Sequence, residues 1–104
     1  MSVPVGTTPN FQLQFDQSSG VDLTSAVNVY VTFRNGLTTL TKTGDDLEVQ
    51  ALSISTMLSQ EETLSFHQGA TEIQANWTTA DGRRIATEVV YYDFDKQLLM
   101  RVIE

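Results

Sequence analysis

The sequence predicts an all-β domain, an antiparallel immunoglobulin-like β-sandwich, from a two-residue alternation of side chains and from regularly spaced turn dipeptides. Apolar residues occupy every second position over residues 27–33 and again over residues 73–77. The first run ends at Asn35-Gly36 and the second ends at Asp81-Gly82. A strand sends successive side chains to opposite faces, so this alternation predicts sheets with one buried and one solvated face.

The strands are expected, in chain order, at residues 11–15, 26–34, 37–43, 47–49, 52–58, 70–78 and 84–94. Asn35-Gly36 favours a hairpin with a type I′ turn, because both residues tolerate the positive φ angles of that turn. The step from Val89 to Val90 shifts the alternation by one residue, which a β-bulge would explain.

One short helical turn is expected near residues 59–64. Ser59 and Glu62 have the spacing of a capping box, in which each side chain binds the backbone N–H of the other residue. Leu64 and Phe66 follow, and the turn should end before Gly69.

The chain of 104 residues is expected to form a single sandwich domain over residues 1–104. Residues 1–9 contain two prolines and a glycine without periodicity, which predicts a loose N-terminal arm. Residues 97–104 are mostly apolar and are interpreted as either a terminal strand or a docking segment. The expected core residues are Phe15, Val29, Val31, Phe33, Leu52, Ile54, Leu58, Leu64, Phe66, Ile73, Trp77, Val90, Tyr92 and Phe94.

Composition narrows the class of protein. A formal net charge of −7 argues against binding to nucleic acid or to an anionic membrane, because the long-range interaction would be repulsive. The absence of cysteine excludes disulfides and thiolate metal sites. The N-terminus shows no pattern of a signal peptide, and no apolar run reaches the length of a membrane helix.

No residue pattern indicates catalysis or a bound cofactor, so no catalytic, cofactor-binding or metal-binding residue is expected, and the protein is not expected to be an enzyme. His67 is the only histidine and is interpreted as an exposed loop residue. Asp45, Asp46 and Glu48 lack the spacing of a calcium loop and are interpreted as a solvated turn. Glu61 and Glu62 suit the start of the helical turn.

Aromatic residues offer a second hypothesis. Trp77, Tyr30, Tyr91 and Tyr92 would form a platform for stacking sugars if several of them shared one exposed face. Trp77, however, has the same strand parity as Ile73, which favours a buried tryptophan.

The order of motifs resembles that of a known group of proteins. Residues 6–9 precede the aromatic strand 11–15, and residues 54–66, with Ser59-Gln60-Glu61-Glu62-Thr63-Leu64 at their centre, lead into residues 72–76. Over residues 6–95 this pattern is similar to small phage and prophage proteins of Gram-positive bacteria. These proteins have an immunoglobulin-like β-sandwich similar to the N-terminal domain of phage baseplate proteins.

The resemblance implies a non-enzymatic phage or prophage structural or assembly protein, such as a tail or baseplate module, that acts through protein–protein contacts. It implies other phage structural proteins as partners and a location in the virion or, during assembly, in the bacterial cytoplasm. A homo-oligomer is expected on separate grounds, because residues 98–103 are more apolar than a free tail and must be buried on their own core or on a neighbour. The alternative is a carbohydrate-binding or adhesin-type sandwich module.

Overall fold

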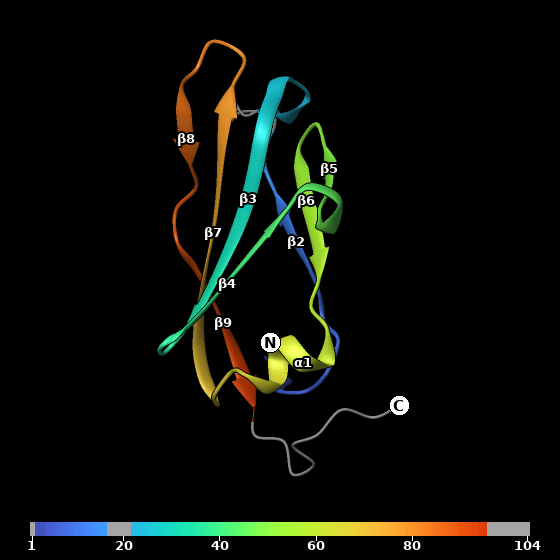
Figure 1. Cartoon of the computed structure of the whole chain (residues 1–104), viewed down its shortest axis with the longest axis vertical. Helices are drawn as coiled ribbons and strands as arrows, with labels where there is room; N and C mark the ends of the chain where they lie inside the picture. The colour runs from blue at the N-terminus through green and yellow to red at the C-terminus, as the bar shows by residue number, and fades with distance from the viewer. Residues whose placement is uncertain (1, 17–21, 96–104) are drawn as a thin grey trace.

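The computed structural model describes residues 2–16 and 22–95, and these residues form two packed β-sheets with one short helix (Figure 1). The sequence-based interpretation of residues 97–104 as a terminal strand or docking segment concerns residues outside the described part of the chain. The strands are β1 (Ser2–Pro4), β2 (Asn10–Gln14), β3 (Ala26–Asn35), β4 (Thr38–Thr43), β5 (Glu48–Gln50), β6 (Ser53–Met57), β7 (Gly69–Thr79), β8 (Arg84–Ala86) and β9 (Val90–Asp95). Helix α1 spans Gln60–Leu64, and two 3-10 turns span Leu23–Ser25 and Gly44–Asp46.

The order of strands is that of an immunoglobulin-like sandwich, as the sequence predicts. The larger sheet has the order β1-β9-β7-β3-β4, with β8 also paired to β7. The smaller sheet has the order β2-β6-β5. With the strands lettered along the chain, these sheets correspond to the G-F-C-C′ and B-E-D arrangements of immunoglobulin domains.

The N-terminal arm is not loose, contrary to the sequence-based expectation. Strand β1 pairs in parallel with β9, with Ser2 opposite Asp93 and Pro4 opposite Asp95. Val5 follows β1, donates its backbone N–H to the Asp95 carbonyl at 2.9 Å and is almost fully buried. The prolines of this segment led to the prediction of a loose arm, but a short strand at the edge of a sheet accommodates a proline.

The hairpin between β3 and β4 forms where expected, but its turn type differs. Asn35 pairs with Thr38, so Gly36 and Leu37 form the two-residue loop. Only Gly36 in this loop has a positive φ, of 59°, which is the pattern of a type II′ turn. Asn35 stays in the strand because its buried side chain is hydrogen-bonded to His67 and Thr71.

The expected bulge near Val89 is present. Asn76 pairs with Ala86, while Ile73 pairs with Val90, so three residues on one strand face two on β7. Thr87 occupies the irregular segment, donates its N–H to the Ala75 carbonyl at 2.9 Å and accepts the Ala75 N–H on its hydroxyl at 3.1 Å. The predicted strand 84–94 is therefore divided into β8 and β9.

Helix α1 begins with the capping box that the sequence predicts. The Ser59 hydroxyl accepts the Glu62 N–H at 3.2 Å, and the Glu62 carboxylate accepts the Ser59 N–H at 2.8 Å. Thr63 is fully buried and donates its hydroxyl to the Thr7 carbonyl at 2.7 Å, which ties the helix to the segment that connects β1 and β2.

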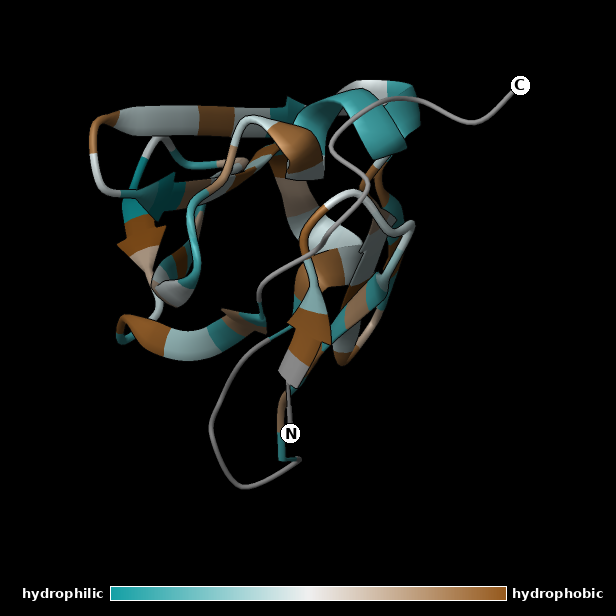
Figure 2. Ribbon diagram, turned by 90° about the horizontal axis from the view of Figure 1, so that it is seen from below, coloured by the Kyte–Doolittle hydropathy of each residue, from teal (hydrophilic) through white to brown (hydrophobic). Residues whose placement is uncertain are grey.

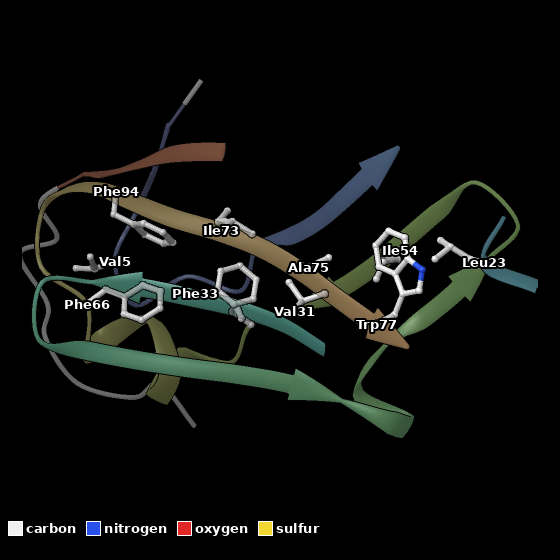
Figure 3. Packing of buried hydrophobic residues seen from close by; sticks show 11 residues of the cluster. Val5, Leu23, Val31, Phe33, Ile54, Phe66, Ile73, Ala75, Trp77 and Phe94 are labelled. Atoms are coloured by element: carbon white, nitrogen blue, oxygen red, sulfur yellow. The ribbon is translucent and has the colours of Figure 1, made fainter. Parts of the chain in front are cut away.

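The core lies between the two sheets, and the alternation of apolar and polar residues appears as bands along the ribbons (Figure 2). Figure 3 shows Val31 and Phe33 of β3 and Ile73, Ala75 and Trp77 of β7 along the middle of the core, with Phe66 and Phe94 at one end and Leu23 and Ile54 at the other. The expected core residues that are buried are Val31, Phe33, Ile54, Leu58, Phe66, Ile73, Trp77 and Phe94. Those that are half-buried are Phe15, Val29, Leu52, Leu64 and Tyr92.

The expectation for Val90 was wrong, since its side chain is 44% exposed. Val90 has the inward parity of Tyr92 and Phe94, but it lies at the start of β9, where the smaller sheet does not cover it. Val5, Leu23 and Ala75 are buried core residues that the sequence-based set did not include.

Candidate functional site

The polar residues considered from the sequence do not converge on a chemical site. Within residues 2–16 and 22–95, no three His, Cys, Asp or Glu side chains are grouped so that they could hold a metal ion. Asp45, Asp46 and Glu48 are exposed around the 3-10 turn that precedes β5. His67 is exposed, as expected, and its backbone carbonyl and N–H both bind the side chain of Asn35.

Glu62 has a structural role at the start of α1. Partial burial would raise the pKa of its carboxyl, but hydrogen bonds from Lys42 and Ser59 and the positive charge of Lys42 outweigh burial and lower it. The Lys42 ammonium lies 2.7 Å from one carboxylate oxygen and donates to the other at 2.8 Å. This pair links α1 to β4, so the Glu62 carboxylate has a structural role.

The four aromatic residues of the sugar-platform hypothesis do not share a face. Trp77 is buried, with 3% of its surface exposed, and stacks edge-on to Phe15 with ring centroids 5.8 Å apart. Tyr92 is half-buried and packs edge-on to Phe11 at 4.9 Å.

The remaining two tyrosines are exposed but separated. Tyr30 lies opposite Asn76 and Tyr91 lies opposite Glu72, so their positions differ by four residues along β7. Four residues of strand correspond to about 13 Å, with β7 between the two rings. Tyr30 and Tyr91 therefore do not form a continuous platform.

The outer face of the larger sheet has a hollow of about 340 Å³, called here the polar hollow. A second hollow of about 310 Å³ lies beside it and is lined by Thr32, Arg34, Glu72, Gln74 and Val89. The residues that line the polar hollow come from β3, β4, β7 and β8, and they are Tyr30, Thr32, Thr41, Asn76, Trp77, Thr78 and Arg84. The Arg84 guanidinium donates to the Asn76 side-chain oxygen at 3.3 Å. Hydroxyl, amide and guanidinium groups around one exposed tyrosine could bind a small polar ligand.

The outer edge of β2 is the second feature. On its inner side β2 pairs with β6, where Phe15 donates its N–H to the Leu52 carbonyl at 2.8 Å and Leu58 donates to the Pro9 carbonyl at 3.0 Å. In an antiparallel pair, residues that exchange backbone hydrogen bonds alternate with residues whose backbone groups point away from the partner. The odd-numbered residues of this segment therefore bind β6.

The even-numbered residues Asn10, Gln12 and Gln14 consequently direct their backbone N–H and C=O groups away from β6. No other strand of the described residues pairs with β2 on that side, because β1 pairs with β9 in the opposite sheet. In immunoglobulin constant-type domains the first strand occupies the corresponding position beside the second. Here that position beside β2 is not filled by β1.

An apolar groove lies alongside this edge, between the two sheets. It has a volume of about 290 Å³ and is bounded by β2 and β6 on one side and by β3, β7 and the start of β9 on the other. Its apolar lining includes Phe11, Leu13, Ile54, Ile73 and Val90. The groove accounts for the unexpected exposure of Val90, because it opens where a neighbouring strand would cover that residue.

The other outer edges among the described strands carry features that discourage pairing. Strand β4 contains Lys42, β5 is three residues long and contains Glu48, β1 contains Pro4 and β8 contains Arg84. Charged residues, proline and short length are the common means of protecting a sheet edge. The residues of β2, Asn-Phe-Gln-Leu-Gln, include no charge and no proline.

Comparison with protein-family models, curated proteins and solved structures found no match for this chain. Among the described residues, no helix has the length and apolar character needed to span a membrane. The edge of β2 and the polar hollow are surface features on which a function can be based. Sequence reasoning missed both, because each depends on which strands become neighbours.

Proposed function

We propose that this protein is a non-enzymatic structural or assembly protein of a phage or prophage, of the tail or baseplate kind, that acts through protein–protein contacts. The observation that supports a binding role is the uncharged outer edge of β2 beside an apolar groove. The phage assignment is supported by the motif resemblance over residues 6–95.

The edge of β2 suits recognition by strand addition. An extended segment that lies along β2 would bind the outward N–H and C=O groups of Asn10, Gln12 and Gln14. Its alternate side chains would enter the groove next to Val90. Main-chain hydrogen bonds provide affinity in this mode, and the pockets for alternate side chains provide specificity.

The proposed partners are other phage structural proteins and further copies of this chain. The proposed location is the virion, or the bacterial cytoplasm during assembly. The formal net charge of −7 supports protein partners over nucleic acid phosphates or an anionic membrane surface.

The test is to tag the protein in its native genome, induce the prophage, purify the particles and measure the protein by mass spectrometry. We expect a constant number of copies per particle. Gln12→Pro should abolish incorporation, because proline removes an outward N–H of β2 without removing a bond to β6.

Gln12→Ala is the matched control, since it shortens the same side chain and keeps the N–H. Incorporation of Gln12→Ala but not of Gln12→Pro would support backbone pairing at β2. Absence of the wild-type protein from the particles would contradict a structural role in the virion, and normal incorporation of both variants would contradict recognition through the backbone of β2.

A carbohydrate-binding module is the second candidate function, and the polar hollow around Tyr30 favours it. In a glycan screen, a glycan that binds in the polar hollow should quench or shift the tyrosine signal. Tyr30→Ala should abolish this binding. The matched control is Tyr91→Ala, which removes the other exposed tyrosine outside the hollow. Loss of glycan binding in both variants, or in neither, would contradict a site at the hollow.

A further inference from the structure

We propose that the outer edge of β2 pairs with β2 of a second copy of this chain, antiparallel and about a two-fold axis through Gln12. The pairing joins the two three-stranded sheets of the copies into one continuous sheet. This inference rests on the proposed protein-binding function and names the partner at the β2 edge.

The sequence of β2 is complementary to itself in this register. With Gln12 opposite Gln12 of the second copy, Asn10 lies opposite Gln14 and Phe11 lies opposite Leu13. Amide side chains therefore meet amide side chains on the outer face, and apolar side chains meet apolar side chains on the inner face. Side chains that lie directly opposite one another on neighbouring strands interact and stabilise a sheet, unless they have like charges.

The backbone geometry agrees with the same register. Asn10, Gln12 and Gln14 have the outward N–H and C=O groups, and antiparallel pairing about Gln12 places these residues opposite one another. The central pair of Gln12 residues then exchanges two hydrogen bonds, and each Asn10 exchanges bonds with a Gln14. If the register shifted by one residue, the outward N–H and C=O groups of one copy would lie opposite residues whose own N–H and C=O groups already bind β6. The hydrogen bonds between the copies could then not form.

The distribution of charged residues favours β2 over the other exposed edges as the contact between two copies. Each copy has a formal net charge of −7, so two copies repel each other at long range. Strand β2 has no charged residue, and the next acid along the chain is Asp16. Pairing through β4, β5 or β8 would instead bring together Lys42, Glu48 or Arg84 of the two copies.

The second copy also covers the apolar groove. In the joined sheet, Phe11 and Leu13 of the second copy point to the inner side, next to the groove mouth. Val90, with 44% of its surface exposed, and the neighbouring half-buried Tyr92 line that mouth. The dimer therefore buries the apolar side chains that the single sandwich leaves open.

The contact is short, since each copy contributes one five-residue strand and the groove mouth. Interfaces smaller than the standard size are typical of weak, reversible association. We expect a dimer that dissociates on dilution, and sedimentation velocity over a series of protein concentrations measures this.

The decisive experiment places charges at Gln12, the residue at the proposed two-fold axis. Gln12→Lys and Gln12→Glu each place like charges opposite one another, so each variant alone should sediment as a monomer at concentrations where the wild type is dimeric. An equimolar mixture should restore the dimer. Gln68→Lys and Gln68→Glu are the matched controls, because Gln68 is exposed and belongs neither to β2 nor to the lining of the groove, and they should leave dimerisation unchanged.

Three results would overturn the inference. A wild-type protein that is monomeric at every concentration would exclude the homodimer, and a loss of thermal stability in Gln12→Pro would then assign the edge to another segment of the same chain. A dimer that tolerates both Gln12→Lys and Gln12→Glu would place the contact elsewhere. Single variants that fail to dimerise and are not rescued by mixing would exclude the two-fold pairing.

The outcome also separates this inference from the proposed function. A monomeric protein whose incorporation into particles still depends on the N–H of Gln12 would overturn the homodimer and support a different protein at β2. A dimer that is rescued by mixing, from a protein absent from the particles, would support the pairing and contradict the virion role.

Discussion

Asn35 shows how a single side chain decides the form of a turn. Its amide nitrogen donates to the His67 carbonyl at 2.9 Å and to the Thr71 hydroxyl at 2.8 Å, and its oxygen accepts the His67 N–H at 2.7 Å. These bonds hold Asn35 as the last residue of β3, so Gly36 takes the first position of the two-residue loop. They also fix the segment between α1 and β7.

Asn35→Ala is expected to lower the free energy of unfolding by at least about 2 kcal/mol, because it leaves the buried Thr71 hydroxyl and the His67 backbone without their partner. Chemical denaturation measures the loss. His67→Ala is the control and should change stability by less than about 0.5 kcal/mol, because only the backbone of His67 binds Asn35. Equal effects of the two substitutions would contradict this role.

Glu62 gives a pH dependence whose sign follows from its lowered pKa. A carboxyl with a lower pKa in the folded state stabilises the fold above its unfolded pKa, and this stability is lost as pH falls through the folded value. Glu62→Gln should therefore cost about 1 kcal/mol at neutral pH, and the difference from wild type should shrink below about pH 4.

Urea denaturation of both proteins at neutral and acidic pH measures this difference. Glu61→Gln is the matched control, because Glu61 is exposed and has the same charge. A difference between wild type and Glu62→Gln that stays constant with pH would show that the carboxylate charge does not contribute.

At the scale of the element, the sequence predicted the features that depend only on neighbouring residues along the chain. Alternation gave the positions of the long strands, and the Ser59–Glu62 spacing gave the capped helix. The shift at Val89 and Val90 gave the bulge, because a bulge changes the parity of the chain itself.

Long-range pairing was not predictable in the same way. Strand β1 has only three residues and no alternation, and it exists because β9 offers a parallel partner. The exposure of Val90 and the open edge of β2 share this cause, since both follow from β1 joining the larger sheet. The polar hollow likewise requires four strands to be neighbours before its residues meet.

The structural importance of the β1 segment can be tested at Val5, which is 3% exposed. Val5→Ala should lower the free energy of unfolding by about 1–3 kcal/mol, through lost burial and the cavity that it leaves. Val27→Ala is the matched control, because Val27 is 61% exposed, and it should cost less than about 0.5 kcal/mol. A neutral Val5→Ala would show that the arm does not contribute to the core in solution.

At the scale of the whole molecule, the buried apolar residues form one cluster that includes residues of both sheets. A single core predicts cooperative unfolding without a separate transition for the smaller sheet. Trp77, the only tryptophan, lies within this cluster and reports on its packing. Its fluorescence and the far-ultraviolet circular dichroism should therefore change with the same denaturation midpoint, and two separate midpoints would contradict a single core.

The net charge of the whole molecule predicts how salt acts on the proposed dimer. Two copies that each have a formal charge of −7 repel one another, while the β2 contact itself contains no charge. The Debye length falls from about 30 Å at 0.01 M to about 10 Å at 0.1 M salt, so added salt should screen the repulsion and lower the dissociation constant. Sedimentation velocity at several salt concentrations measures this change.

The mixed dimer of Gln12→Lys and Gln12→Glu is the matched comparison. Its contact gains an attraction between opposite charges that salt weakens, so its affinity should rise less with salt than that of the wild type. If salt instead weakens the wild-type dimer, ionic pairs must dominate the contact. In that case the contact could not be centred on the uncharged strand β2, and it would have to involve an edge that contains Lys42, Glu48 or Arg84.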